Sequence, residues 1–370
     1  MLIGVPKEIK DHETRVGLSP EGVRALCADG HEVQIENGAG ARVGFPDSAY
    51  LDAGAHVVSD AEAVFACDML VKVKELQPAE FQWLRQGQIL FGFHHLAPDR
   101  ALLERMLAAK VACVAYETVS DAQGRLPLLA PMSQIAGRLS IQVGAWALQV
   151  PNGGSGVLLS GTDGVAPAKV VIIGAGVVGS NAAQIALGLG AQVTVLDVSR
   201  ERLARLDQTH RGKLQTCLNE PAALAAHITD TDLIVGASQV SGKRAPKILT
   251  RELLRQMRPG SVLVDVAIDQ GGIAETSRPT SHSNPIYLEE GVVHYCVTNI
   301  PALVARTATL ALTRATFPYV KALANLGLKK ALSADAGLKN GLQIHAGHIT
   351  YKNLAEDVGK PYVPPEQALA

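Results

Sequence analysis

Three glycines in the middle of the chain have the spacing of a loop that binds the phosphates of a dinucleotide. Gly174, Gly176 and Gly179 form the pattern GxGxxG directly after the β-branched run Val170–Ile173, which predicts a buried parallel strand. The first glycine of such a loop allows a tight turn, the second lets the backbone approach a pyrophosphate, and the third lets the following helix pack on the strand. The unpaired amides at the start of that helix would face the phosphates.

An acid after the next strand indicates which dinucleotide the loop binds. The segment Gln192–Leu196 predicts a second strand, and Asp197 follows it, at the ~20-residue distance where a carboxylate holds the ribose 2′-OH of NAD. The same charge would repel the 2′-phosphate of NADP, although Arg200 and Arg202 lie close by and could partly offset it. Glycine spacing alone also occurs in ordinary turns. The full order of strand, loop, helix, strand and acid predicts a nucleotide-binding domain.

Two further segments place a cationic and two titratable side chains at the ends of predicted strands. Ligands of open parallel sheets bind beyond the carboxyl ends of the strands, so polar residues there are candidates for chemistry. Lys74 ends the predicted strand Leu70–Lys74, and His94 and His95 follow the predicted strand Ile89–Phe93. An imidazole can act as a general acid or base near neutral pH. The spacing alone is equally compatible with a solvated lysine and with core or surface histidines.

An acid and an arginine complete the set of candidates. Asp269 emerges from the predicted strand Ser261–Ala267 into a glycine loop, where its carboxylate could orient a water, stabilise a cationic intermediate or cap the turn. Arg15 follows the predicted strand Leu2–Val5, and a guanidinium has the fork geometry that binds a carboxylate. Surface arginines are common, so residue type and position alone leave the role of Arg15 open.

The composition is that of a soluble α/β protein. The chain has 370 residues, of which 47% are hydrophobic and 19% charged, and its formal net charge is −1. This charge offers no basic field to a phosphate backbone, so we expect no nucleic acid partner. The chain opens on a strand-like segment and contains no uncharged apolar stretch of about 18 residues, which predicts a cytoplasmic protein without a membrane span. The five cysteines are scattered singly, which predicts buried thiols and neither a metal site nor disulfides.

The order of the predicted elements indicates two domains. Strand-like and helix-like segments alternate before and after the glycine loop, which predicts an α/β fold with parallel sheets. Long helical periodicity at 130–149, and again from 301 to about 326, predicts two helices where the chain passes from one domain to the other. We therefore expect a nucleotide-binding domain at 131–304, inserted into a discontinuous domain made of 1–130 and 305–370.

Eight segments together are much more specific than the glycine spacing. They are VPKEIKDHETRVGLSP (5–20), LVKVKE (70–75), GQILFGFHHLAPD (87–99), LPLLAPMSQIAGRLS (126–140), VVIIGAGVVGSNAA (170–183), VLVDVAIDQGG (262–272), SRPTS (277–281) and CVTNIPA (296–302). With these segments the chain closely resembles the family of alanine dehydrogenases and transhydrogenase alpha subunits over nearly its whole length.

The resemblance implies two Rossmann-like domains and the NAD-dependent oxidative deamination of L-alanine to pyruvate and ammonium, together with the reverse amination of pyruvate. It implies that Arg15 and Lys74 hold the carboxylate and oxygen of the substrate. It further implies that His95 is the general acid and base and that Asp269 acts on the water and aminated intermediates. The family's histidine directly precedes a leucine, which selects His95 over His94.

The resemblance also implies which residues contact NAD. Three of them, Asn219, Ser238 and Gln239, lie in less distinctive stretches of the sequence. The implied contacts are Ser133, Gly174, Gly176, Val177, Val178, Gly179, Asp197, Arg202, Asn219, Ser238, Gln239, Val266, Ala267, Ile268, Asp269, Arg278, Val297, Thr298, Asn299 and Ile300.

Assembly and alternative functions follow from the same resemblance. It implies a homo-oligomer, usually a hexamer, for which the helices predicted at 131–149 and 301–326 are suitable surfaces. Three other functions remain: a transhydrogenase-like subunit that passes hydride between nicotinamides, an enzyme that condenses a 2-oxo acid with an amine of ornithine or lysine, and a non-catalytic NAD sensor. The complete set of Arg15, Lys74, His95 and Asp269 weighs against the first and the last of these.

Overall fold

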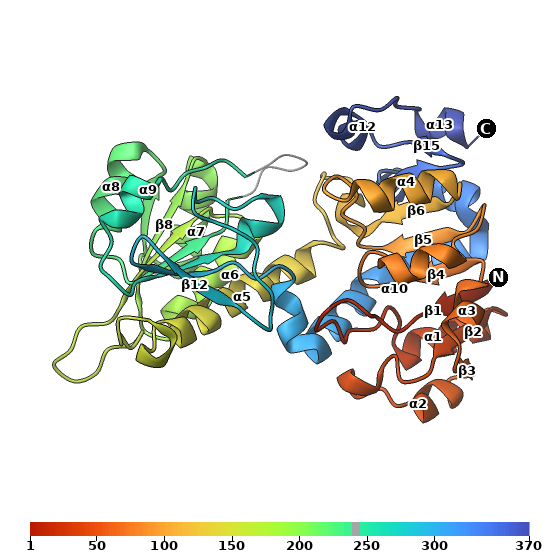
Figure 1. The fold of residues 1–370 in the computed structure, drawn as a ribbon, viewed down its shortest axis with the longest axis horizontal. Coiled ribbons are helices and arrows are strands. Elements are labelled where there is room, and N and C mark those ends of the chain that lie inside the picture. Colours follow the sequence, from red (N-terminus) through yellow and green to blue (C-terminus); the bar gives the residue numbers. More distant parts are fainter. Residues whose placement is uncertain (239–244, 370) are drawn as a thin grey trace. The chain divides into compact units, whose positions relative to one another are not determined.

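The computed structural model describes residues 1–238 and 245–369, and the chain forms two compact units. The first unit combines Met1–Met132 with Ala302–Ala370, and the second is the continuous segment Ser133–Pro301. Each unit has its own sheet with helices packed against it (Figure 1). The mixed α/β class and the two parallel-dominated sheets confirm the predicted fold class.

The first unit contains an eight-stranded sheet with the strand order β15-β14-β6-β5-β4-β1-β2-β3. Strands β1 to β6 pair in parallel in the doubly wound order. Strands β14 and β15 add an antiparallel pair at the edge next to β6. The strands are β1 (Leu2–Val5), β2 (Glu32–Glu36), β3 (His56–Val58), β4 (Met69–Val71), β5 (Ile89–Gly92), β6 (Ala112–Ala115), β14 (Leu342–His345) and β15 (His348–Ile349). The helices are α1 (Pro20–Ala28), α2 (Asp47–Leu51), α3 (Ala61–Phe65), α4 (Arg100–Ala108), α10 (Ala305–Ala334), α11 (Ala336–Lys339), α12 (Lys352–Val358) and α13 (Pro365–Ala368).

The second unit repeats this plan in a seven-stranded sheet of order β12-β13-β11-β10-β7-β8-β9, in which all pairs are parallel except β12 with β13. Its strands are β7 (Lys169–Ile173), β8 (Gln192–Asp197), β9 (Gln215–Leu218), β10 (Leu233–Gly236), β11 (Val262–Asp265), β12 (Ile286–Glu289) and β13 (Val292–Tyr295). Its helices are α6 (Val177–Gly188), α7 (Arg200–His210), α8 (Pro221–Ile228) and α9 (Arg251–Arg255), and α5 (Ala130–Ala147) begins at the boundary of the two units.

Local sequence signals account for several helix ends. The side chain of Ser19 accepts a hydrogen bond from the Gly22 amide, and Pro20 occupies the first position of α1, as the sequence predicts. The side chain of Ser199 caps α7 in the same way. The central strands are buried along their length because helices cover both faces of a parallel sheet.

Several predicted elements have different bounds in the structure. The strand predicted at Ser261–Ala267 is β11, which spans Val262–Asp265, and the helix predicted at 130–149 is α5, which ends at Ala147. The predicted strand Leu70–Lys74 ends at Val71, because the amides of Val73 and Lys74 donate to the carboxylate of Glu8 and not to a neighbouring strand. The helix predicted from 301 to about 326 is α10, which begins at Ala305 and continues to Ala334 through a non-helical residue at Gly327.

Three findings bear on the predicted environment of the chain. None of the described helices is long and apolar enough to cross a membrane. All five cysteines are free thiols; Cys67, Cys113 and Cys296 are buried, while Cys27 and Cys217 are half-buried. No cluster of three or more metal-ligating side chains occurs among the described residues.

We predict that Gly4→Ala destabilises the first unit, because a Cβ at this position of β1 would lie 2.4 Å from the Val64 carbonyl oxygen. The cost of forcing this backbone apart is about 1–3 kcal/mol. Gly188→Ala in α6 is the matched control, since its Cβ would meet no atom within 4 Å, and alanine there favours the helix. Thermal unfolding should show a lower midpoint for Gly4→Ala only. Equal midpoints for both variants would contradict the close packing of Gly4 against the Val64 carbonyl.

Candidate functional site

The candidate substrate-binding residues of the first unit follow three neighbouring strands of its sheet. Arg15, Lys74 and His95 come after β1, β4 and β5, which are neighbouring parallel strands. Because the carboxyl ends of parallel strands lie at the same edge, Lys74 and His95, each three residues beyond its strand, belong to one side of the unit. Arg15 lies in the loop between β1 and α1. This edge is where ligands of open α/β sheets bind.

Arg15 is held by a glutamate two residues before it. The side chain of Arg15 is 2% exposed and that of Glu13 is fully buried, and the two form an ion pair. The Arg15 Nε donates to Glu13 Oε1 over 2.7 Å, and the Arg15 backbone amide donates to the same oxygen over 3.0 Å. Arg15 Nη1 also lies 3.0 Å from Met132 Sδ. A paired guanidinium with its plane fixed from two sides is prepared for a carboxylate ligand.

Lys72 and Glu8 form a buried charge cluster beside the candidate lysine. The Lys72 Nζ lies 2.8 Å from Glu80 Oε1 and 3.2 Å from Glu8 Oε2. Burial alone would lower the pKa of Lys72, but Glu8 and Glu80 outweigh it and raise that pKa. Glu8 Oε1 accepts hydrogen bonds from the amides of Val73 and Lys74, over 2.6 and 3.3 Å. Lys72 is therefore a structural cation, and its cluster fixes the backbone of Lys74.

Lys74 itself pairs with the next residue in the chain. Its Nζ lies 3.3 Å from Glu75 Oε2, and Lys10 forms an ion pair with the other oxygen of Glu75. Burial would raise the pKa of Glu75, but Lys74 and Lys10 outweigh it and lower this pKa to about 2. Two cations thus share one carboxylate, which leaves positive charge at this edge of the sheet for an anionic ligand.

His95 is half-buried and has an unusual backbone conformation. Its φ of +46° lies in the left-handed region, which costs a non-glycine residue about 1–3 kcal/mol unless its surroundings hold it there. The amide of His95 donates to Glu117 Oε1 over 2.8 Å, and its imidazole stacks on the Phe93 ring with centroids 5.9 Å apart. Burial and the charge of Lys74 lower the pKa of His95 to about 3, so the imidazole is neutral at pH 7.

The neighbouring His94 has a different environment. It is 1% exposed, and among the described residues neither of its ring nitrogens has a hydrogen-bond partner. Burial lowers its pKa to about 4, which keeps the ring neutral. His94 therefore has the properties of a core histidine, whereas His95 has those of a titratable group at the sheet edge.

The glycine loop of the second unit has the geometry of a phosphate cradle. A Cβ at Gly174 would lie 2.6 Å from the Ala237 carbonyl oxygen, and one at Gly179 would lie 1.7 Å from the Gly174 carbonyl oxygen, so neither position accommodates a side chain. At Gly176 a Cβ would meet no atom within 4 Å, which leaves open space beside the backbone at the start of α6. The residues present thus fit a pyrophosphate that approaches the helix N-terminus.

Asp197 ends β8 and binds the glycine loop directly. It is buried, and its Oδ2 accepts from the Ala175 amide over 2.6 Å while its Oδ1 accepts from the Ser199 amide over 2.7 Å. Arg202 Nη1 lies 3.8 Å from Oδ2, as the nearby position of this arginine in the sequence suggested. The carboxylate thus shapes the loop as well as offering oxygens to a ribose hydroxyl.

Asp269 lies in a turn that a second aspartate organises. Asp265 ends β11 and is fully buried; its carboxylate accepts from the Ala267 amide, the Ile273 amide and the Ser277 hydroxyl over 3.2, 2.7 and 2.5 Å. Burial raises the pKa of Asp265, while these hydrogen bonds oppose the rise. Asp269 is exposed on the 3-10 helix Val266–Gln270 that follows. The turn presents Asp269 beyond the end of a buried strand, as predicted.

Most of the remaining cofactor candidates follow the carboxyl ends of strands of the same sheet, while Ser133 and Arg278 do not. Asn219 follows β9 and its amide donates to the Asp197 carbonyl oxygen, and the Ser238 amide lies next to Gly174. Arg278 covers the Tyr287 ring at 3.9 Å. Gln239 lies outside the described residues. Ser133 lies on α5, Val177 and Val178 begin α6, Val266, Ala267 and Ile268 follow β11, and Val297, Thr298, Asn299 and Ile300 follow β13.

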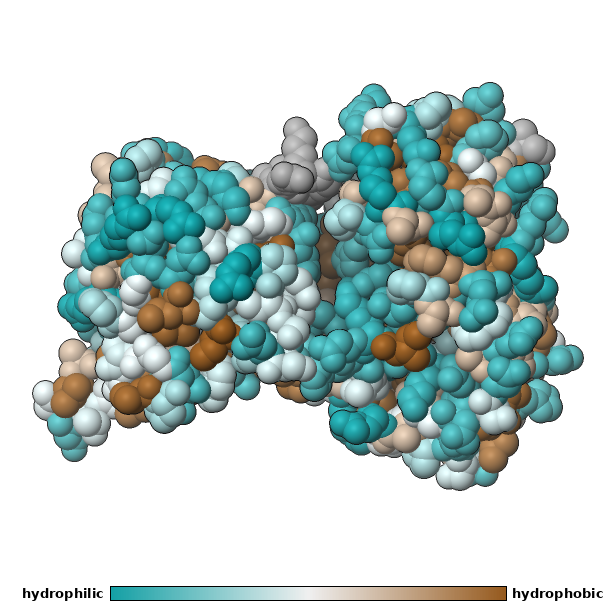
Figure 2. Space-filling model, viewed as in Figure 1, coloured by the Kyte–Doolittle hydropathy of each residue, from teal (hydrophilic) through white to brown (hydrophobic). Residues whose placement is uncertain are grey.

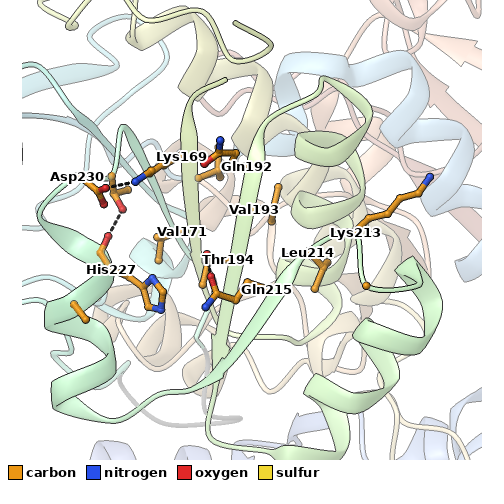
Figure 3. A pocket seen from close by; sticks show the side chains of 14 residues that line it. Lys169, Val171, Gln192, Val193, Thr194, Lys213, Leu214, Gln215, His227 and Asp230 are labelled. Atoms are coloured by element: carbon orange, nitrogen blue, oxygen red, sulfur yellow. Dashed lines mark hydrogen bonds and ion pairs between the residues drawn. The ribbon is translucent and has the colours of Figure 1, made fainter. Parts of the chain in front are cut away.

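A cavity of about 710 Å³ lies at the opposite edge of this sheet (Figure 3). Lys169, Gln192 and Gln215, which begin β7, β8 and β9, line it together with residues of α8. Figure 3 shows Lys169 paired with Asp230 at its rim. None of the predicted cofactor residues lines this cavity, so it is separate from the glycine loop.

Comparison with known proteins identifies the family. The family model described as alanine dehydrogenase/PNT, N-terminal domain, matches residues 4–136, and the corresponding C-terminal domain model matches residues 140–352. The alanine dehydrogenase of Halomonas elongata is 50% identical over 364 residues, which are 98% of each chain. The chain belongs to the alanine dehydrogenase family.

Solved structures agree with membership of the alanine dehydrogenase family. An L-alanine dehydrogenase structure is 48% identical, with a TM-score of 0.93 over 97% of this chain and 99% of that one. A transhydrogenase from Sinorhizobium meliloti is 24% identical, with a TM-score of 0.79 over 95% of this chain and 99% of that one. The second likeness shows that the two proteins share a fold.

The sequence analysis missed the acids that hold the candidate residues of the first unit. Glu8 and Glu117 hold the backbone of Lys74 and His95, although they are 66 and 22 residues away in the chain. Both follow an apolar strand by two or three residues, which is the signal that singled out Asp269. Glu13 and Glu75 each lie within two residues of a candidate cation in the sequence.

The lowered pKa of Glu75 predicts a pH-dependent contribution to stability. Its ionised form is favoured in the folded state, so this contribution is present above pH 4.5 and is lost as the pH falls through about 2. Glu75→Gln should therefore lower the unfolding midpoint at pH 7, and the difference from wild type should shrink as the pH falls below 4.5.

Glu366→Gln is the control for this experiment. Glu366 also pairs with a lysine, but it is exposed, and such pairs contribute little. Thermal scans between pH 7 and pH 3 compare the two variants. A Glu75→Gln effect that is independent of pH, or no larger than that of Glu366→Gln, would contradict the assigned charge cluster.

Proposed function

We propose that the protein is an NAD-dependent L-alanine dehydrogenase, which converts L-alanine, NAD and water to pyruvate, ammonium and NADH and also catalyses the reverse amination. The observation that carries this proposal is the 50% identity to a curated alanine dehydrogenase over 98% of both chains. The candidate residues Lys74, His95 and Asp269 lie within four residues of the end of a parallel strand, and Arg15 lies in the loop that follows β1.

Arg15 and Lys74 are proposed to bind the substrate carboxylate and the oxygen of the 2-oxo acid. Glu13 fixes the guanidinium plane, and Glu8 fixes the backbone of Lys74, so both cations are oriented before the substrate arrives. Prior orientation converts the reaction of separate molecules into an effectively unimolecular step. The two cations also attract the negative charge of pyruvate or alanine to this edge of the sheet.

His95 is proposed to move the proton as water adds and ammonia leaves. Its neutral imidazole has an acceptor nitrogen at pH 7. The charge of Lys74 lowers the pKa of His95, so a bound carboxylate that offsets this charge should raise the pKa again. His95 would then be a stronger base when the substrate is bound.

The residues of the second unit fit NAD. We propose that the glycine loop and the start of α6 hold the pyrophosphate and that Asp197 holds the ribose, which disfavours the 2′-phosphate of NADP. The chemistry that NAD supplies when bound is acceptance of a hydride. Asp269 is proposed to stabilise the cationic, aminated intermediates by its charge.

We also propose a homohexamer that works in the cytoplasm, with L-alanine, pyruvate and ammonium as its small-molecule partners. Several large apolar side chains are exposed in and beside the two helices predicted as assembly surfaces. Figure 2 shows brown apolar residues between hydrophilic ones on the surface. Such exposure is typical of surfaces that another subunit covers. The exposed apolar residues are Trp146 and Val150 at the end of α5, Leu158 and Val165 in the loop after it, and Leu303, Leu310 and Leu326 in and before α10.

The first prediction from this function is substrate-dependent formation of NADH. Purified protein with L-alanine and NAD should produce NADH rapidly, while D-alanine or NADP should give little product because of the oriented carboxylate site and the charge of Asp197. Absorbance of NADH measures the rate. Binding of NAD without turnover of any amino acid would overturn the dehydrogenase proposal and favour the transhydrogenase-like, condensing or sensor alternatives.

The second prediction distinguishes the two adjacent histidines. His95→Asn should lower kcat by roughly 10²- to 10⁴-fold, the usual loss when a general acid or base is removed. His94→Leu should keep kcat within about threefold, because no hydrogen bond among the described residues ends on its ring nitrogens. Steady-state kinetics of both variants tests this. Equal losses would show that the pair, and not His95 alone, is required.

A further inference from the structure

We propose that Glu117 is a positioning residue that holds His95 in its reactive orientation. The inference rests on the proposed function, because it concerns the side chain assigned there as the acid and base. Glu117 would act through the backbone of His94 and His95, and it contacts neither substrate nor cofactor in this proposal.

One carboxylate binds two consecutive amides. Glu117 Oε1 accepts a hydrogen bond from the His95 amide over 2.8 Å and from the His94 amide over 3.2 Å. The second oxygen, Oε2, lies 3.4 Å from the His94 amide. A single side chain thus accepts from both amides shortly after β5 ends at Gly92.

The topology brings Glu117 to this position. β5 and β6 are parallel neighbours, and Gly92 pairs with Ala115 at their carboxyl ends. Glu117 lies two residues beyond Ala115, on the 3-10 helix Tyr116–Thr118, and His95 lies three residues beyond Gly92. The hydrogen bonds of Glu117 therefore join the segments that follow two adjacent strands.

The backbone conformation of His95 explains why hydrogen bonds from its backbone to Glu117 are needed. Its φ of +46° is rare for a residue with a side chain, and it persists only where the surroundings determine it. The stack on Phe93, and the contact of Phe93 with Tyr116 at 5.1 Å, restrain the imidazole from one side. The hydrogen bonds from the His94 and His95 amides to Glu117 restrain the backbone that carries the imidazole. Without them His95 can relax to an ordinary conformation, which redirects its ring.

Two variants of Glu117 distinguish the effect of side-chain length on kcat from the effect of side-chain charge. Glu117→Gln keeps an oxygen at the same distance without the charge, and Glu117→Asp keeps the charge but withdraws it by one methylene. If Glu117 acts by position, the Gln variant should retain kcat within about threefold, and the Asp variant should lose about 10- to 100-fold, with the KM for NAD unchanged in both.

Asp121→Ala is the matched control. Asp121 Oδ1 also accepts from two backbone amides, those of Gln123 and Arg125, each over 2.9 Å, but it lies in a loop after the sheet. Its removal should leave kcat and the KM for NAD within about twofold of wild type, whatever it does to thermal stability. A comparable loss of kcat in Asp121→Ala would make the effect one of general stability and overturn the proposal.

A double-variant cycle gives the second readout. In the His95→Asn background, Glu117→Asp should cause little further loss of kcat, since the residue that it positions is already gone. A Gln variant as impaired as the Asp variant, an Asp variant as active as wild type, or losses that multiply in the double variant would each overturn the role of Glu117. Absence of L-alanine turnover in the wild type, or a fully active His95→Asn variant, would instead overturn the proposed function.

Discussion

A buried carboxylate has to be paired, and in the first unit this requirement connects the candidate residues to the ends of the strands. Glu8, Glu13 and Glu117 each accept a hydrogen bond from the backbone amide of a candidate residue, namely Lys74, Arg15 and His95. The amides need acceptors where the ladder stops. Glu8 and Glu13 need donors because they are buried, whereas Glu117 is half-buried. The same hydrogen bonds therefore offset the cost of taking the carboxylates out of water and fix the positions of the candidate residues.

The second unit uses aspartates for the same purpose. Asp197 binds the Ala175 amide of the glycine loop, and Asp265 binds the amides and hydroxyl that close the turn around Asp269. Each aspartate is the last residue of its strand, so a short side chain is sufficient. In the first unit the acids lie in neighbouring segments, and the longer glutamate spans the gap.

Local patterns were enough to predict the centre of each sheet and the glycine loop. β1, β7 and β8 are short runs rich in β-branched residues, and their bounds agree with the prediction to within a residue. The edge strands β3, β9, β12 and β15 and the strand β14 next to β15 were not predicted, because two to four residues are too few to show a clear period. Glu8 and Glu117 were missed for another reason. Their partners are distant in the sequence, and only the parallel pairing of the strands reveals them.

The place of β14 in the first sheet has a consequence for biosynthesis. This strand pairs with β6, but the 226 residues 116–341 separate the end of β6 at Ala115 from the start of β14 at Leu342. The second unit is continuous in sequence, so all of it leaves the ribosome before β14 does. Until then β6 is an unprotected, fully apolar edge, and such edges readily pair with other chains. Nascent chains stalled before residue 342 should therefore be the ones that aggregate or require a chaperone.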